Sequence, residues 1–247
     1  MLSKKQQKSI RQLHSKKFRR LENRFLVEGF KCCTELLRSD FEIELLIKVE
    51  NKGFDFFSRV QIEEISEKEF RTLSTHENPE GILAVAKIPD TKQFKVSQNE
   101  NLVLLLDGIS DPGNLGTIFR TASWFGVTTI LLSENCVEPF NPKVVRATMG
   151  AIFHLNFLQT NLENEIPKLK ENDFRIVGTS LNEKSVSLQK LNSANKNAIL
   201  IGSESHGISK NLENLSDSLV KINSVGETSE SLNVGVATGI ILHWFSK

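Results

Sequence analysis

Short apolar segments alternate with segments of helical periodicity after residue 101, and this alternation constrains the fold most. Residues 102–109 begin with a continuous apolar run, which is typical of a strand buried on both faces of a sheet. Apolar side chains in 115–125 form one helical stripe. Further strands are expected at 128–133, 155–158, 175–179, 198–202 and 219–222, and further helices at 141–153 and 231–245. The alternation predicts an α/β fold with a mostly parallel sheet flanked by helices.

The first ninety residues predict a separate, smaller α/β domain. Helices are expected over 26–37 and 67–73, and strands over 45–49 and 82–88. The segment that follows is polar, contains a proline and lacks apolar periodicity, so it is interpreted as a linker. The expected division of the chain is a basic N-terminal arm at 1–22, a small domain at 23–88, the linker at 89–101 and a larger domain at 102–247.

Positive charge is concentrated at the N-terminus, although the net charge of the 247-residue chain is only +1. The basic residues that precede the first acidic residue, Glu22, are Lys4, Lys5, Lys8, Arg11, Lys16, Lys17, Arg19 and Arg20. Such a run is either a solvated surface or an arm that contacts phosphates, whose binding would weaken with salt. Alone, it does not distinguish RNA, DNA and an anionic membrane.

The remaining composition argues against several classes of protein. No apolar run reaches the length of a membrane span, and the basic N-terminus lacks the apolar region of a secretion signal. The 3 cysteines contain no C-x-x-C pair, and the 5 histidines lack metal-ligand spacing. We therefore expect a cytoplasmic protein with no metal site and no membrane partner.

Three motifs each follow an expected buried strand. The first is D-G-I-S-D-P-G-N-L-G at 107–116, which leads into T-I-F-R-T-A at 117–122. Asn114 stands where the N-cap of the following helix is expected, and Arg120 lies on the polar side of that helix. An ordinary capping asparagine and a surface arginine would explain this motif by itself.

The second motif is I-L-I-G-S-E-S-H-G-I-S at 199–209, in which Gly202 and Gly207 flank Glu204 in a tight loop. Glycines at such a place let bare backbone approach a ligand. The loop lacks the lysine of a P-loop and the G-x-G-x-x-G of a dinucleotide site, and a lone glycine-rich turn is a weak signal.

The third motif is E-S-L-N-V-G-V-A-T-G-I at 230–240, in which Ser231 could cap the final helix and Asn233 would lie in its first turn. Gly235, Ala237 and Gly239 thin this helix, so that another backbone could come close and the face would suit a dimer interface. A terminal core helix with a serine cap would also explain the motif.

Taken in this order and spacing, N-L-G-x-x-x-R-T-A, I-G-S-E-x-x-G-I and S-L-N-V-x-V-A resemble the signature motifs of the SpoU (TrmH-like) branch of the SPOUT methyltransferases. The resemblance covers about 102–247. The segments F-L-V-E-G-F-K at 25–31 and P-E-G-I-L-A-V at 79–85 resemble that family's substrate-binding domain. The resemblance implies a homodimer that uses S-adenosylmethionine to methylate a ribose 2′-hydroxyl of RNA, with a trefoil knot in the larger domain.

The resemblance also implies roles for individual residues. Arg120 would activate the ribose hydroxyl, Asn114 would orient the ribose, and Glu204 would hold its own loop. Ser231 and Asn233 would position the substrate and the backbone of the third motif. The cofactor-binding residues would be Gly202, Gly207, Ile222 and Leu232, with Thr179 and Ser180 beside the adenine. The eight cations of the basic arm would contact RNA.

Two positions depart from the family pattern, because Asn223 follows Ile222 where proline is usual and Gly235 replaces a common serine. Alternatives remain open at this stage. A non-enzymatic RNA-binding or ribosome-assembly protein would explain the basic arm but not the combined motifs. A transfer RNA 2′-O-methyltransferase, a base methyltransferase and a metabolic enzyme are further alternatives. The N-terminal domain is typical of family members that modify large-subunit ribosomal RNA, which favours that substrate.

Overall fold

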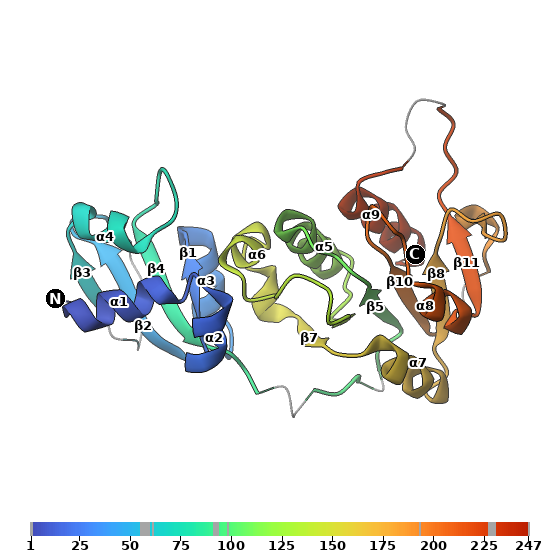
Figure 1. The fold of residues 1–247 in the computed structure, drawn as a ribbon, viewed down its shortest axis with the longest axis horizontal. Coiled ribbons are helices and arrows are strands. Elements are labelled where there is room, and N and C mark those ends of the chain that lie inside the picture. Colours follow the sequence, from blue (N-terminus) through green and yellow to red (C-terminus); the bar gives the residue numbers. More distant parts are fainter. Residues whose placement is uncertain are drawn as a thin grey trace. The chain divides into compact units, whose positions relative to one another are not determined.

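The computed structural model describes residues 2–54, 60, 62–90, 94–97, 99–192, 194–226 and 231–246, so parts of the linker and Glu230 of the third motif lie outside the described residues. The chain forms two compact units. The first contains Met1–Asp90 and Glu138–His154, and the second contains Thr91–Val137 and Leu155–Lys247 (Figure 1). We expected residues 138–154 in the larger domain, whereas the structure includes them in the first unit.

The first unit is built on a mixed sheet. Its strands, in the spatial order β1-β4-β2-β3, are β1 (Arg24–Glu28), β4 (Ile82–Lys87), β2 (Ile43–Val49) and β3 (Ile62–Ile65). Strand β4 is antiparallel to β1 and β2, and β3 is parallel to β2. The helices are α1 (Lys4–Gln12), α2 (Lys16–Glu22), α3 (Phe30–Leu37), α4 (Glu67–Leu73) and α6 (Pro142–Ala147), followed by a 3-10 turn (Ala151–His154).

The single helix expected over 26–37 is wrong, because this segment contains the end of strand β1 and then helix α3. Gly29 separates the two elements with a φ of 101°, a backbone conformation that glycine adopts readily. The apolar side chains of β1 and α3 run on without a polar break, so periodicity alone does not reveal the boundary.

The basic N-terminal segment is folded into two helices rather than extended as an arm. Ser3 and Gln6 form a capping box at the start of α1. Leu2, Ile10 and Leu13 are buried in the hydrophobic core of the first unit. The segment is therefore an integral part of the unit, with its cations on the outer surface.

Arg19 is the exception among these cations and corrects the prediction that it contacts RNA. Its side chain is 2% exposed, and its guanidinium donates to a carboxylate oxygen of Glu138 at 2.6 Å. It also donates to the carbonyl oxygens of Leu13 and His14 at 2.8 and 2.9 Å. This buried ion pair joins α2 to the later segment of the first unit.

Replacing Arg19 with alanine is expected to destabilise the first unit by about 3–5 kcal/mol, because Glu138 would then be a buried charge without its partner. Urea unfolding followed by circular dichroism measures this loss. The exposed neighbour Arg20 provides the control, since its replacement by alanine should leave the unfolding midpoint unchanged. Equal midpoints for the two variants would contradict this account of the ion pair.

The second unit contains a parallel sheet of seven strands in the order β7-β6-β5-β10-β8-β11-β9. The strands are β5 (Leu102–Leu106), β6 (Thr129–Leu132), β7 (Asn156–Gln159), β8 (Arg175–Thr179), β9 (Val186–Ser187), β10 (Asn197–Ile201) and β11 (Ser218–Lys221). The helices are α5 (Pro112–Trp124), α7 (Leu162–Glu171), α8 (Lys210–Leu215) and α9 (Val234–Phe245). The expected α/β class with a parallel sheet is confirmed.

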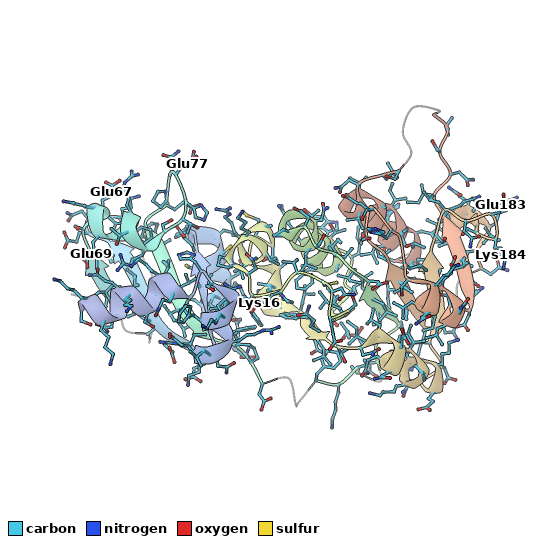
Figure 2. The ribbon with its side chains drawn as sticks, viewed as in Figure 1. Lys16, Glu67, Glu69, Glu77, Glu183 and Lys184 are labelled. Atoms are coloured by element: carbon cyan, nitrogen blue, oxygen red, sulfur yellow. The ribbon has the colours of Figure 1, made fainter. Side chains whose placement is uncertain are left out.

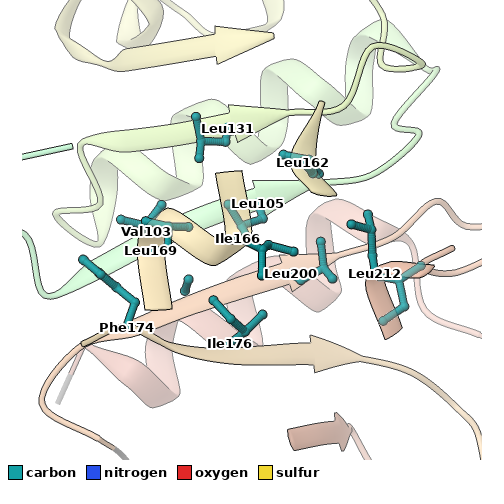
Figure 3. Packing of buried hydrophobic residues seen from close by; sticks show 12 residues of the cluster. Val103, Leu105, Leu131, Leu162, Ile166, Leu169, Phe174, Ile176, Leu200 and Leu212 are labelled. Atoms are coloured by element: carbon teal, nitrogen blue, oxygen red, sulfur yellow. The ribbon is translucent and has the colours of Figure 1, made fainter. Parts of the chain in front are cut away.

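Buried strands explain the continuous apolar runs of this sheet. Alternate residues of a strand point to opposite faces, so a strand covered on both sides needs apolar residues throughout. Val103 and Leu105 of β5 pack in one cluster with Ile166 of α7 and Leu212 of α8 (Figure 3). No helix in the described parts of the chain is long and apolar enough to span a membrane.

Helices α5 and α9 pack against each other within the second unit. A Cβ atom on Gly235 would lie 2.9 Å from the methyl carbon of Thr117, and one on Gly239 would lie 3.6 Å from that of Thr121. The small-residue face of α9 thus allows close approach to α5 of the same chain, and it is not available as the dimer interface suggested by the sequence. The trefoil knot stays a prediction.

Candidate active site

Four loops follow neighbouring strands of the parallel sheet, and they are the natural place for a ligand. Strands β5, β10, β8 and β11 are adjacent in the sheet. The carboxyl ends of parallel strands meet at one edge, where ligands bind in open α/β sheets. The first motif follows β5, the second follows β10, and the predicted cofactor residues Thr179 and Ile222 lie at the ends of β8 and β11.

The first motif forms a loop before α5 begins, and side chains from the segment after β6 hold its backbone by hydrogen bonds. The amide of Gly108 donates to Ser133 Oγ at 2.9 Å, and that of Ile109 donates to Cys136 Sγ at 3.3 Å. Burial raises the pKa of the Cys136 thiol, which stays protonated and donates to the Leu106 carbonyl at 3.3 Å. Neighbouring side chains thus fix the backbone of this loop.

Asn114 is not the N-cap of α5, contrary to expectation. The cap is Asp111, whose Oδ1 accepts a hydrogen bond from the Asn114 amide at 2.7 Å, with Pro112 at the first helical position. Asn114 therefore lies in the first turn. Its side chain is not needed for capping and can contact another motif.

The second motif is a tight loop that only glycine at position 202 allows. A Cβ atom on Gly202 would lie 2.0 Å from the carbonyl carbon of Gly207 and 2.2 Å from the amide nitrogen of Ile208. Ser203 and Gly207 exchange two backbone hydrogen bonds at 3.1 and 2.9 Å, and Gly207 has a φ of +66°. Glu204 lies exposed at the turn of this loop.

Asn233 connects the three motifs. As the N-cap of α9, its Oδ1 accepts from the amides of Gly235 and Val236 at 3.0 and 3.3 Å. Its Nδ2 donates to Asn114 Oδ1 at 2.9 Å and to Glu204 Oε1 at 2.6 Å. Only an amide side chain offers an acceptor to the helix and donors to both partners at once. The residues predicted from separate motifs are therefore in direct contact.

Glu204 also contacts the start of the last helix, because its Oε1 accepts from the Val234 amide at 3.0 Å. Ser231 does not cap this helix as expected. It is exposed, and it has no hydrogen-bond partner among the residues that the structure describes. Its predicted role in positioning substrate stays a prediction.

Arg120 lies on the exposed side of α5 and is available for a ligand. Within the described ranges its guanidinium forms no hydrogen bond and no ion pair. Thr117, Arg120 and Trp124 are spaced along one exposed stripe of the helix. A guanidinium that no protein carboxylate neutralises can bind a phosphate through two parallel hydrogen bonds.

The predicted cofactor residues differ in what their side chains do. Thr179 Oγ1 donates to the Leu200 carbonyl at 3.0 Å, and Ser180 Oγ donates to Glu213 Oε1 at 3.2 Å. Both hydroxyls therefore stabilise the sheet edge, and a ligand there would meet mainly backbone. Ile222 is half-buried and Leu232 is exposed. A polar cavity of about 650 Å³ is lined by residues of β8, β9, β11 and α8 and includes none of the predicted site residues.

The predicted RNA-contacting cations are on the surface of the first unit, apart from Arg19. The exposed cations are Lys4, Lys5, Lys8, Arg11, Lys16, Lys17 and Arg20, and Figure 2 labels Lys16. None of these side chains forms an ion pair with another described residue. Their charge is thus free to attract an anionic partner.

Sequence reasoning missed two acidic residues at the start of the first motif. Asp111 caps α5, and Asp107 is buried with Oδ2 accepting from the Ser209 amide at 2.8 Å. The signal was available, since Asp107 directly follows an expected buried strand at the edge where ligands bind, and Asp111 precedes a proline that suits the first helical position.

Comparisons with known proteins found matches over most of the chain. Residues 101–243 match the SpoU rRNA Methylase family, and residues 4–84 match the MRM3-like substrate binding domain. The 23S rRNA (guanosine(2553)-2′-O)-methyltransferase RlmP of Bacillus subtilis is 32% identical over 96% of this chain and 94% of its own length.

Two solved structures have the same fold. The S-adenosylmethionine-bound rRNA methyltransferase from Sinorhizobium meliloti has a TM-score of 0.85 and 28% identity, over 99% of this chain and 95% of that one. The SpoU methyltransferase AviRb from Streptomyces viridochromogenes has a TM-score of 0.84 over 99% of this chain and 97% of its own, but at 23% identity it supports the fold alone. The chain belongs to the SpoU rRNA methylase family and carries an MRM3-like substrate-binding domain.

Proposed function

We propose that the protein transfers the methyl group of S-adenosylmethionine to a ribose 2′-hydroxyl of large-subunit ribosomal RNA. The contacts of Asn233 with Asn114 and Glu204 carry this proposal, because they join the three motifs at one edge of the sheet. The similarity to a curated 23S rRNA 2′-O-methyltransferase over nearly the whole chain supports the same reaction and substrate.

The loops at this edge fit S-adenosylmethionine. Gly202 and Gly207 leave backbone without side chains, and a Cβ atom on Gly207 would meet nothing within 4 Å. Ile222 and Leu232 would offer further backbone groups, while Thr179 and Ser180 shape the end of β8. When bound there, the cofactor supplies a methyl group activated by its positively charged sulfur.

In this mechanism, Arg120 grips the phosphate next to the target ribose and polarises the 2′-hydroxyl. Arginine stays protonated in proteins, so the proton leaves to a phosphate oxygen or to water. With the cofactor bound, this arrangement would let the ribose oxygen take the methyl group, and S-adenosylhomocysteine would be the leaving group. Asn114, held by Asn233, orients the ribose, and holding the reactants in line is worth about 7–11 kcal/mol.

The exposed cations of α1 and α2 form the RNA-binding surface in this proposal. Replacing Lys4, Lys5 and Lys8 with alanine is expected to weaken RNA binding and to lower the slope of log K against log salt by about 2–3, because each phosphate contact contributes about 0.7–0.9. Fluorescence anisotropy at several salt concentrations measures the slope. Lys68 of α4, exposed in the same unit, is the control position. An unchanged slope for the triple variant would show that RNA binds to another surface of the protein.

We further propose that two copies of the chain associate through the exposed apolar surface of α5 and α9. Trp124 is 85% exposed, Val236 53% and Ile240 41%, and exposed apolar patches commonly mark interfaces. Val236 and Ile240 are four residues apart on α9, so they lie on the same face of that helix. Such a dimer would place the proposed active sites next to the interface.

Replacing Trp124 with glutamate is expected to convert the dimer to a monomer, because the interface would then contain a desolvated charge. Light scattering should report a drop from twice the chain mass of 27.8 kDa to that mass itself. Leu21 is 74% exposed on α2, outside the proposed interface, and its replacement by glutamate should leave the mass unchanged. A Trp124 variant that stays dimeric would exclude this surface.

Ribose methylation maps of total RNA from cells with and without the protein test the proposed substrate. We expect one 2′-O-methyl mark to disappear from large-subunit ribosomal RNA. Loss of a transfer RNA mark would select the transfer RNA alternative, and an unchanged map would overturn the proposed reaction in the cell. A folded protein that shows no calorimetric binding of S-adenosylmethionine would favour the non-enzymatic alternative.

A further inference from the structure

Asp107 is a buried carboxylate that the proposed mechanism does not use. It follows the last residue of β5, and its amide donates to the Ile201 carbonyl at 2.8 Å, which extends the pairing of β5 with β10. Its side chain is 9% exposed and forms no ion pair with any described residue. Burying a carboxylate is costly unless hydrogen bonds replace its hydration, so its partner is informative.

That partner is the backbone at the far end of the second motif. Asp107 Oδ2 accepts from the Ser209 amide at 2.8 Å. Ser209 is the N-cap of α8, and its own side chain makes no capping hydrogen bond. Asp107, at the end of β5, therefore accepts a hydrogen bond from the residue at which the second-motif loop ends and α8 begins. This contact fixes the position of that residue.

The first motif thus holds the second-motif loop, residues 202–209, at two places. Asp107 binds Ser209 at the end of the loop. Asn114, through Asn233, is linked to Glu204 near its beginning. Gly207 lies between these two places, and the loop closes so tightly that a Cβ atom on Gly202, at its start, would lie 2.0 Å from the Gly207 carbonyl carbon. Losing either link would let the loop shift.

We propose that Asp107 is a positioning residue for the cofactor, which acts through the Ser209 amide to hold the second-motif loop in its ligand-binding shape. This inference rests on the proposed function, because it assigns the backbone of that loop to S-adenosylmethionine. In this proposal Asp107 acts through the Ser209 amide and contacts neither substrate itself. Its loss should therefore weaken the use of S-adenosylmethionine and leave the use of RNA unaffected.

Replacing Asp107 with alanine is expected to raise the KM for S-adenosylmethionine at least about 10-fold, because a hydrogen bond to a charged acceptor is lost. The KM for ribosomal RNA should stay within about twofold. Asp107→Asn retains a carbonyl oxygen that can accept from Ser209, so its KM for S-adenosylmethionine should stay within about threefold of the original. Asp107→Glu keeps the negative charge but moves the carboxylate by one methylene. It should therefore also raise the KM for S-adenosylmethionine.

Asp217 is a control with the same kind of backbone contact, since its Oδ2 accepts from the Ile176 amide at 2.8 Å and its amide donates to the Ile176 carbonyl. Unlike Asp107 it is exposed, and its Oδ1 pairs with Lys170. This link is at the amino end of β8, away from the motif loops. Asp217→Ala should change thermal stability but neither KM. A purely structural role of Asp107 would make its variants behave in the same way, with a lower active fraction and both KM values unchanged.

The test is steady-state methyl transfer to ribosomal RNA, with each substrate varied in turn, together with calorimetric titration of S-adenosylmethionine. A selective rise in the KM and Kd for S-adenosylmethionine in Asp107→Ala supports the inference. If Asp107→Ala does not fold, the comparison of Asp107→Glu with Asp107→Asn tests the inference, because the KM for S-adenosylmethionine should rise in the first and stay nearly unchanged in the second. Unchanged values in a folded variant would overturn the role of Asp107 alone, whereas a wild-type protein that binds no S-adenosylmethionine would overturn the proposed function itself.

Discussion

Replacing Arg120 with alanine is expected to lower kcat at least about 100-fold, because removing one group that stabilises the transition state commonly costs this much. The affinity for S-adenosylmethionine should change by less than about twofold. Arg120 is exposed and bonds to no other described side chain, so neither the fold nor the cofactor loops depend on it. The loss should therefore appear in turnover.

Single-turnover methyl transfer at saturating S-adenosylmethionine measures this effect without product release. Arg120→Lys is the matched variant, since it keeps the positive charge but loses the planar, two-pronged set of donors. We expect its rate to lie between those of the wild type and the alanine variant. Full activity of Arg120→Ala would show that the phosphate grip assigned to this residue is wrong.

Replacing Gly202 with alanine is expected to raise the Kd for S-adenosylmethionine at least about 10-fold, because overpacking of this kind costs about 1–3 kcal/mol. The added Cβ would lie 2.0 and 2.2 Å from backbone atoms of Gly207 and Ile208. Backbone atoms cannot rotate away as a side chain can. The loop would have to open, and its contact with the cofactor would be lost.

Isothermal titration of S-adenosylmethionine measures this effect, and Gly226→Ala provides the control. A Cβ atom on Gly226 would meet nothing within 4 Å, and its φ is not positive, so cofactor binding should be unchanged. Equal affinities of the two variants would show that the tight turn at Gly202 does not form the cofactor site.

Helices and strands whose ends are marked by local residue patterns were predicted well from the sequence. Strand β8 and helix α4 have the predicted bounds, and Asn141 with Pro142 begins α6 as expected. Helices α1, α2, α7 and α8 and strands β1, β3 and β9 were not predicted. The ends of helices were harder, because Asp111 and Asn114 are both good caps and only the fold decides between them.

Tertiary contacts account for most of what the sequence did not reveal. The pair formed by Arg19 and Glu138 joins residues 119 positions apart, so no local pattern identifies the arginine as buried. Glycines on the last helix indicate a close approach but not its partner, which is α5 of the same chain. The motifs themselves contain the candidate site residues, so the sequence names them, whereas their mutual contacts through Asn233 required the fold.

A crystal structure of the protein with S-adenosylmethionine tests the central claim most directly, namely that the motif loops hold the methyl donor opposite Arg120. The account predicts the cofactor against the backbone of Gly202, Ile222 and Leu232, with the Arg120 guanidinium of the same or the partner subunit facing its methyl group. A cofactor bound away from these loops, or an Arg120 that faces away from the methyl group in both subunits, would contradict it.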